Sequence, residues 1–349
     1  MSSSNARPPH PPANTVETEL VAVLVAVSQG QPRVLTRGGN HVLPAGPFES
    51  SHRSLQAGLR AWVEAQTHHP LGYVEQLYTF ADRDRANRAG QRIISVSYLG
   101  LTREGQPAGA SEPASASRPV SSVSQGDEVR WQDWYRYFPW EDWRAGCPAI
   151  VPGLIVPMLR RWARQGEDLA IRRARRQRVE DTFGSDDSVW NEELVLQRYE
   201  LLFEAGLVPE AQQRGRVSPA PSPLAPSRKG RAPAAEQGVV AGDAMLHDHR
   251  RILATAMARL RAKIRYRPVV FELMPPEFTL LQLQQAFEAV AGRCLHKQNF
   301  RRFIEQQALV EETGAMARGT AGRPAKLFQF RGDIVRERAI AGSKLPLAR

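Results

Sequence analysis

The stretch FTLLQLQQAFEAVAGRCLHKQNFRRFIEQQALV, residues 278–310, sets the expectation for the fold of the C-terminal part. Thr279 is a residue type that caps helix N-termini, and Gly292 is the type that most often ends a helix. Between them, apolar residues recur at helical spacing. The stretch therefore predicts a helix over residues 280–291, followed by a short turn and a second helix.

The second helix carries a cluster of polar and cationic side chains on its first turns. Phe300, Phe303 and Ile304 form its predicted buried face. Asn and Gln can pair bidentately with adenine, Arg with guanine, and Lys with guanine or phosphate. We therefore predict a DNA recognition helix, with base or phosphate contacts from Lys297, Gln298, Asn299, Arg301 and Arg302.

A basic, Gly-rich tip, MARGTAGRPAK, separates two short predicted strands, residues 310–312 and the LFQF that follows the tip. Two strands around a basic loop are typical of the wing of a winged helix. In such a wing, Arg318, Arg323 and Lys326 could reach phosphate or the minor groove.

The order FT-LxxLQxxFE, KxNFRR and GRPAKLFxF resembles the winged helix of the Nudix-related transcriptional regulators of NAD metabolism. The resemblance implies an α+β winged helix-turn-helix domain that binds a double-stranded DNA operator as a homodimer. A palindromic operator would match the two-fold symmetry of such a dimer. The alternative is a winged helix that contacts protein instead of DNA.

The distribution of charge favours a polyanionic partner for the C-terminal part. The formal net charge is +11, yet residues 1–208 hold 23 Lys and Arg against 24 Asp and Glu. Residues 242–349 hold 19 against 10. A basic domain beside a neutral one is the pattern of nucleic-acid binding.

A second motif, LPAGPFESSHRSLQAGLRAWVEAQT, lies near the N-terminus. It resembles the Nudix box, G-x5-E-x7-R-E-U-x-E-E-x-G-U, in which U is aliphatic. Counted from Gly46, the conserved Arg is kept as Arg60 and one Glu as Glu64. The other three Glu positions hold His52, Ala61 and Ala65.

The missing carboxylates argue against catalysis. Magnesium is a hard cation that needs oxygen ligands to clamp a diphosphate and activate water. One Glu of four cannot supply that cage. We therefore predict no catalytic residues, no metal site and no required cofactor, and we interpret Arg60 as a structural remnant. The alternative is a nucleoside-diphosphate hydrolase with a shifted cage, for example Glu49, Glu64 and Glu75, and an accessory DNA-binding module.

The segment GYVEQLYTFADRDRANRAGQRIISVSYLGL, after the box, resembles the same regulators, and YFPWEDWRAG resembles a group of divergent Nudix-like proteins. The resemblance implies a degenerate α/β Nudix-like sandwich, a mixed sheet with flanking helices, that binds ADP-ribose or a related nucleotide. Arginine suits phosphate through charged bidentate contacts, and Tyr78 or Phe80 could stack an adenine. The candidate ligand residues are Arg37, Arg60, Gln76, Tyr78, Arg83, Arg85 and Arg92. The alternative is that these arginines are solvated and the aromatic residues are core.

Two further groups of residues allow several interpretations. His52, His68 and His69 lack a carboxylate or Cys at ligand spacing, which favours surface histidines over a metal site. The tryptophans Trp131, Trp134, Trp140 and Trp143 fall within thirteen residues and could form core, a ligand wall or an inter-domain contact.

Composition and the positions of the low-complexity and Pro-rich segments give the expected domain order. A tail (1–14) precedes the Nudix-like domain (15–208), which contains a low-complexity loop (104–128) expected to be mobile. A linker rich in Pro, Ala and Ser (209–241) leads to the winged-helix domain (242–335) and a basic tail (336–349). The chain has two Cys and no long apolar segment, so we expect a cytoplasmic protein without a membrane span. The most economical function is a transcriptional repressor that responds to ADP-ribose.

Overall fold

The computed structural model describes residues 16–39, 41–67, 71–81, 92–104, 129–184, 190–216, 242–266, 269–317 and 324–332. Its strands are β1 Glu17–Ser28, β2 Gln31–Thr36, β3 Ala45–Pro47, β4 Tyr73–Phe80, β5 Ile93–Leu101, β6 Arg130–Asp133, β7 Val310–Met316 and β8 Lys326–Phe330. Its α-helices are α1 Leu55–Thr67, α2 Val156–Arg164, α3 Leu169–Phe183, α4 Val195–Glu204, α5 Pro209–Arg216, α6 His249–Tyr266, α7 Leu280–Ala291 and α8 Lys297–Gln307. Among the described residues, no helix combines the length and the apolar character needed to cross a membrane.

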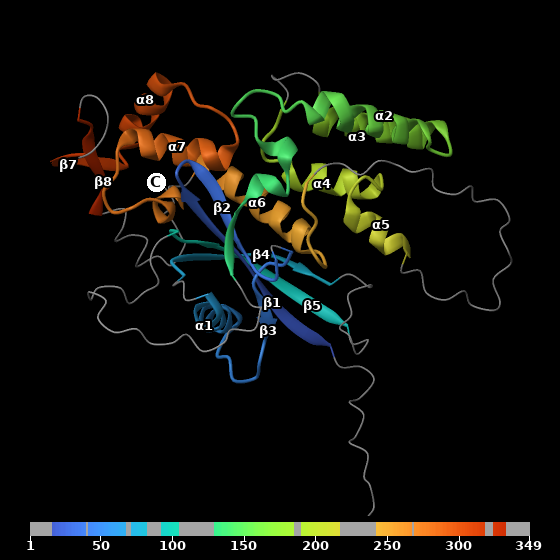
Figure 1. Cartoon of the computed structure of the whole chain (residues 1–349), viewed down its shortest axis with the longest axis horizontal. Helices are drawn as coiled ribbons and strands as arrows, with labels where there is room; N and C mark the ends of the chain where they lie inside the picture. The colour runs from blue at the N-terminus through green and yellow to red at the C-terminus, as the bar shows by residue number, and fades with distance from the viewer. Residues whose placement is uncertain are drawn as a thin grey trace, which may run out of the picture.

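A mixed sheet in the order β4-β5-β1-β2-β6, with β3 paired to β1, forms the centre of the molecule (Figure 1). β1 runs parallel to β5 and antiparallel to β2. Its run LVAVLVAV is buried on both faces, which explains why apolar residues do not alternate with polar ones there. The sheet and its flanking helices confirm the predicted α/β architecture.

Helix α1 covers one face of this sheet. Leu20 and Leu24 of β1 pack there with Leu59 of α1. Gly46, the first residue of the box motif, lies against this helix so closely that a Cβ would come within 1.9 Å of the indole nitrogen of Trp62. The box motif therefore folds as a tight loop and helix even though three of its four carboxylates are missing.

Helices α4, α6 and α7 cover the opposite face. One hydrophobic core joins Val23 and Leu99 of the sheet to Leu260 of α6, Phe287 of α7 and Leu201 of α4. The expected domain that begins at residue 242 therefore shares its core with the first domain. The periodicity of α6 predicts a helix correctly but cannot show which sheet its apolar face covers.

The expected linker, residues 209–241, begins with the ordered helix α5. Glu210 of α5 accepts a hydrogen bond from Met245 N at 3.1 Å and pairs with the buried Arg250 of α6 at 3.3 Å. This end of the linker is thus anchored to the core. The rest of the linker (217–241), the two tails and residues 105–128 of the expected loop lie outside the described residues.

Candidate nucleic-acid interface and effector face

The winged helix begins with a reciprocal cap on α7. Gln282 N donates to the Thr279 hydroxyl at 3.2 Å, and Thr279 N donates to the side chain of Gln282 at 2.8 Å. At the other end, Gly292 has a φ of 72° and ends the helix in the left-handed region. The predicted bounds of this helix, residues 280–291, are confirmed.

Helix α8 packs on α7 through two buried residues, Phe300 and Ile304. The ring of Phe300 meets that of Phe287 edge-on, with centroids 5.4 Å apart. Phe303, predicted to be buried with them, is 36% exposed. It lies next to Ile304 in sequence and is therefore rotated about 100° around the helix axis.

The five predicted recognition residues of α8 all lie in solvent. None of them bonds to another described side chain, so their donors and acceptors are available to a partner. They occupy the first two turns, the part of a recognition helix that reaches base edges. These residues are Lys297, Gln298, Asn299, Arg301 and Arg302.

The wing is an antiparallel pair, β7 and β8, extended by backbone bonds between Phe278 and Phe328. Lys326, a predicted phosphate contact, pairs with Glu312 across the two strands at 2.8 Å. Arg318 and Arg323, the other two predicted contacts, lie outside the described residues.

The predicted ligand residues do not converge on one point. Arg60 of α1 donates to the carbonyls of Leu71 and Gly72, which ties α1 to the loop before β4. That contact fits its interpretation as a structural remnant. Arg37 lies beyond β2, a strand that β5 and β1 separate from β4.

Three other candidates, Tyr78, Arg92 and Gln76, lie at the β4–β5 edge of the sheet. Tyr78 is 60% exposed and meets the Phe80 ring edge-on. Arg92 donates to Ala81 O at 2.8 Å, just beyond the end of β4. Gln76 is exposed on the same strand. Arg83 and Arg85, from the connection between the strands, lie outside the described residues.

The alternative hydrolase cage is not assembled. Glu64 is exposed on α1, whereas Glu75 binds α6 on the other face, pairing with Lys263 and with Arg259, the latter at 3.1 Å. Within the described ranges, no group of three His, Cys, Asp or Glu side chains could hold a metal. His52, at a lost Glu position, accepts a hydrogen bond from Glu49 N at 3.0 Å, while His68 and His69 lie outside the described residues.

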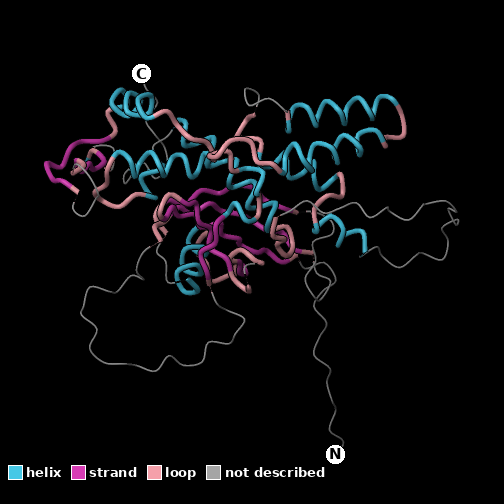
Figure 2. The backbone as a smooth tube through the Cα atoms, turned by 45° about the horizontal axis from the view of Figure 1, so that its top comes forward, coloured by secondary structure: helices cyan, strands magenta, loops and turns pink. Residues whose placement is uncertain are grey.

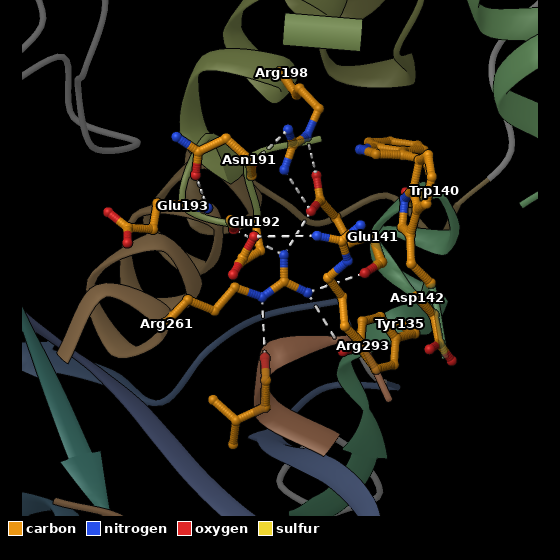
Figure 3. A network of polar contacts seen from close by, with 12 residues as sticks. Tyr135, Trp140, Glu141, Asp142, Asn191, Glu192, Glu193, Arg198, Arg261 and Arg293 are labelled. Atoms are coloured by element: carbon orange, nitrogen blue, oxygen red, sulfur yellow. Dashed lines mark hydrogen bonds and ion pairs between the residues drawn. The ribbon is translucent and has the colours of Figure 1, made fainter. Parts of the chain in front are cut away.

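A buried ionic network joins the two halves of the chain (Figure 3). The carboxylate of Glu141 accepts bonds from Arg198 of α4 at 2.6 and 2.9 Å and from Arg261 of α6 at 2.7 Å. All three side chains have zero exposure. Burial alone would raise the pKa of Glu141, but the two guanidinium groups outweigh burial and hold that pKa below its usual value.

The segment around Glu141 also holds the end of α7. Trp143 N donates to Gly292 O at 2.7 Å, and the Tyr135 hydroxyl donates to Ala289 O at 2.8 Å. A Cβ on Gly292 would come within 2.5 Å of Glu141 O. We call residues 135–143 the clamp.

The tryptophan cluster is core and inter-domain contact at once. Trp134, Trp140 and Trp143 are buried in the shared core, and Trp131 is half-buried. Sequence reasoning missed the charged network because Glu141 lies 57 residues from Arg198 and 120 from Arg261. The one available signal was a Glu flanked by tryptophans in YFPWEDWRAG, since a charge in so apolar a context needs a partner.

Comparison with known proteins agrees with the geometry of the C-terminal part. Residues 270–330 match the family described as the NrtR DNA-binding winged helix domain. Residues 270–330 are therefore similar to the winged helix of that family, and we call them the NrtR-type winged helix. An ADPR responsive transcriptional repressor NtrR from Acinetobacter baylyi is 42% identical over 83 residues, which span 24% of this chain and 33% of that protein.

Two solved structures resemble the chain over most of its length. NrtR from Shewanella oneidensis, complexed with a 27mer DNA, is 19% identical with a TM-score of 0.46, covering 91% of this chain and 95% of its own. A MutT/nudix family protein from Enterococcus faecalis is 15% identical with a TM-score of 0.45, covering 93% and 89%.

Proposed function

We propose that this protein is a transcriptional repressor that binds an operator through its NrtR-type winged helix. The observation that carries the proposal is α8. Two buried residues anchor this helix, and its first two turns present five polar or cationic side chains to solvent. Side chains of these types on a docked helix are suited to the donor and acceptor pattern of the major groove. A homodimer on a two-fold symmetric operator is part of this proposal.

The effector in this proposal is ADP-ribose or a related nucleotide, bound by the Nudix-like part. The similar Acinetobacter protein is described as ADPR responsive, and the box motif folds as a loop and helix on the sheet. Tyr78 and Gln76 of β4 and Arg92 just before β5, all three exposed, are our candidates for contact with the nucleotide. We expect binding without turnover, because only Glu64 remains of the four box carboxylates.

Two sets of contacts support communication between the effector face and the DNA-binding part. The loop held by Arg60 ends at Gly72, where a Cβ would lie 2.8 Å from the carboxylate of Glu272, in the segment between α6 and α7. On the same side, Glu75 of β4 pairs with Lys263 of α6. A ligand changes DNA affinity only if it favours one arrangement of such contacts over another.

Fluorescence anisotropy on the DNA upstream of the protein's own gene tests the operator-binding proposal. Titrations at fixed salt against a scrambled duplex separate selective from non-selective binding, which so basic a domain will also show. Asn299→Ala should reduce selectivity by about 5- to 150-fold, the value of one good base contact. The control is Arg53→Gln. Arg53 is exposed just before α1 and outside the winged helix, so this change should leave selectivity unchanged. Equal affinity of the wild-type protein for both duplexes would overturn the proposal.

Adding ADP-ribose to the same titration tests the effector. We expect ADP-ribose to weaken selective binding, and binding that ignores it would remove the effector part of the proposal. A magnesium-dependent assay separates sensing from hydrolysis. Turnover of ADP-ribose that Glu64→Ala abolishes would favour the hydrolase alternative.

A further inference from the structure

The helical hairpin α2–α3 carries a concentration of positive charge that the recognition helix does not explain. Residues 156–183 contain eight arginines and four acidic residues. The rest of residues 1–208 contains fifteen Lys and Arg against twenty Asp and Glu. The charge of this half is therefore segregated, and its positive part is gathered on one pair of helices.

Several side-chain contacts fix the conformation of the hairpin. Its turn is tight at Gly166, whose carbonyl accepts a hydrogen bond from Arg172 Nε at 2.8 Å. Asp168 caps α3 by accepting from Ile171 N at 2.7 Å. The guanidinium of Arg175 lies over the Trp162 ring, 4.3 Å from its centroid. Arg172, Arg175 and Asp168 thus stabilise the hairpin itself.

Besides Arg161, four arginines of the hairpin are exposed and make no ion pair with a described residue: Arg160, Arg164, Arg173 and Arg176. Three of them line a cleft of about 260 Å³ between the helices, with Ala163 and Val179 as its floor and Glu180 as its single acidic side chain. Within each helix they are one turn apart, so each helix presents two of these guanidinium groups on one of its faces, and we call the four side chains together the arginine face. Convergent arginines without carboxylate partners have unfilled capacity for phosphate.

The hairpin and α8 lie on the same side of the central sheet. Leu159 and Trp162 of α2 belong to the core on the face opposite α1, the face that also carries α7. Figures 1 and 2 show α2 and α3 at one end of this side and α8 at the other. A duplex that is seated on α8 and runs along this side toward its other end would therefore approach the hairpin.

We propose that the arginine face of α2–α3 is a second DNA contact, which binds backbone phosphates beside the segment read by α8. The contact reads no bases, because its cations come from an inter-helical cleft rather than from a helix that could enter a groove. It adds affinity and salt dependence to binding. The inference rests on the proposed DNA-binding function, and the experiment distinguishes failure of the inference from failure of that function.

The test compares two versions of one quadruple change in the full chain. Arg160, Arg164, Arg173 and Arg176 are all changed to Gln, which removes the charge, or all to Lys, which keeps it. Affinity for a duplex of about 60 base pairs, roughly six helical turns, is measured as a function of salt. The same series is run with a random-sequence duplex, since phosphate contact does not depend on sequence. Far-ultraviolet circular dichroism checks that both variants fold.

We expect the Gln variant to lower the slope of log affinity against log salt by about 2 to 4, since each phosphate contact contributes about 0.9. The Lys variant should keep the wild-type slope, and the preference for upstream over scrambled DNA should be unchanged in both. Equal slopes for the wild-type and Gln proteins would overturn the inference. The inference would also be overturned if the Gln variant kept the wild-type slope but lost the thermal shift that inorganic phosphate causes in the wild-type protein. The cleft would then bind small anions rather than DNA. If the wild-type protein shows no sequence preference, the proposed operator binding is wrong. The salt slopes still show whether the hairpin contacts phosphate.

Discussion

At the scale of single residues, the stability of the molecule depends on Glu141. Glu141→Gln leaves two fully buried arginines with a neutral partner, which should cost about 3 to 5 kcal/mol of unfolding free energy. Urea unfolding at neutral pH measures this cost. The matched control is Glu204→Gln, which breaks a pair with Arg178 whose side chains are 47% and 45% exposed and should cost under about 1 kcal/mol. Equal costs for the two variants would contradict the assignment of Glu141 as the centre of the network.

The same carboxylate predicts a pH dependence. Its pKa in the folded protein lies below the ordinary value, so the unfolded state binds the proton more readily. The contribution of Glu141 is then fully present above the unfolded pKa of about 4.3 and is lost as pH falls through the folded pKa. The wild-type and Glu141→Gln proteins should differ by a constant amount above about pH 6 and converge in acid. A difference that widens below pH 4 would have the wrong sign.

Gly292 provides a second prediction at this scale. Gly292→Ala places a Cβ on a left-handed residue and within 2.5 Å of Glu141 O. Gly314 of the wing has a φ of 80° and no neighbour within 4 Å of a built Cβ, so Gly314→Ala isolates the conformational part of the effect. We expect the control to cost about 1 kcal/mol and Gly292→Ala to cost at least about 2 kcal/mol. Thermal unfolding of the two variants compares them directly.

Elements with local signals could be predicted from the sequence, and elements defined by distant partners could not. Thr279 and Gly292 mark the ends of α7 in the sequence itself, and the structure has the same bounds. Helix α6 was recognisable as a helix, yet the ion pair that links it to β4 joins Arg259 to Glu75, which lies 184 residues away in the sequence. The basic run of α3 has no strong apolar periodicity because only Val179 and Phe183 of that helix are buried.

The cap of α7 gives a prediction at the scale of the element. Thr279→Ala removes the side-chain acceptor for Gln282 N, and such a loss costs about 0.5 to 2 kcal/mol. Thr279→Ser keeps the hydroxyl and should restore most of the stability. Hydrogen exchange of the first-turn amides of α7 measures the local effect. Equal protection in the Ala and Ser variants would show that the cap does not stabilise this helix.

At the scale of the whole molecule, the N-terminal part that holds the central sheet and the winged-helix part share one core. The buried network crosses between them, so neither part can lose its packing without exposing the other. We therefore expect a single cooperative calorimetric transition, with the calorimetric enthalpy equal to the van't Hoff enthalpy. Two separated transitions would show that the halves are independent domains.

Because the clamp holds Gly292, a rotation of the backbone at this glycine moves the far end of α8 more than its near end. Only the short turn that ends at His296 separates the clamped glycine from α8, whose 11 residues span about 16 Å. A rotation of about 4° at the clamped end therefore moves the far end of α8 by about 1 Å. We predict that a displacement of that size breaks the hydrogen bonds to base edges proposed for α8, so that a small backbone shift in residues 135–143 weakens the proposed DNA contact.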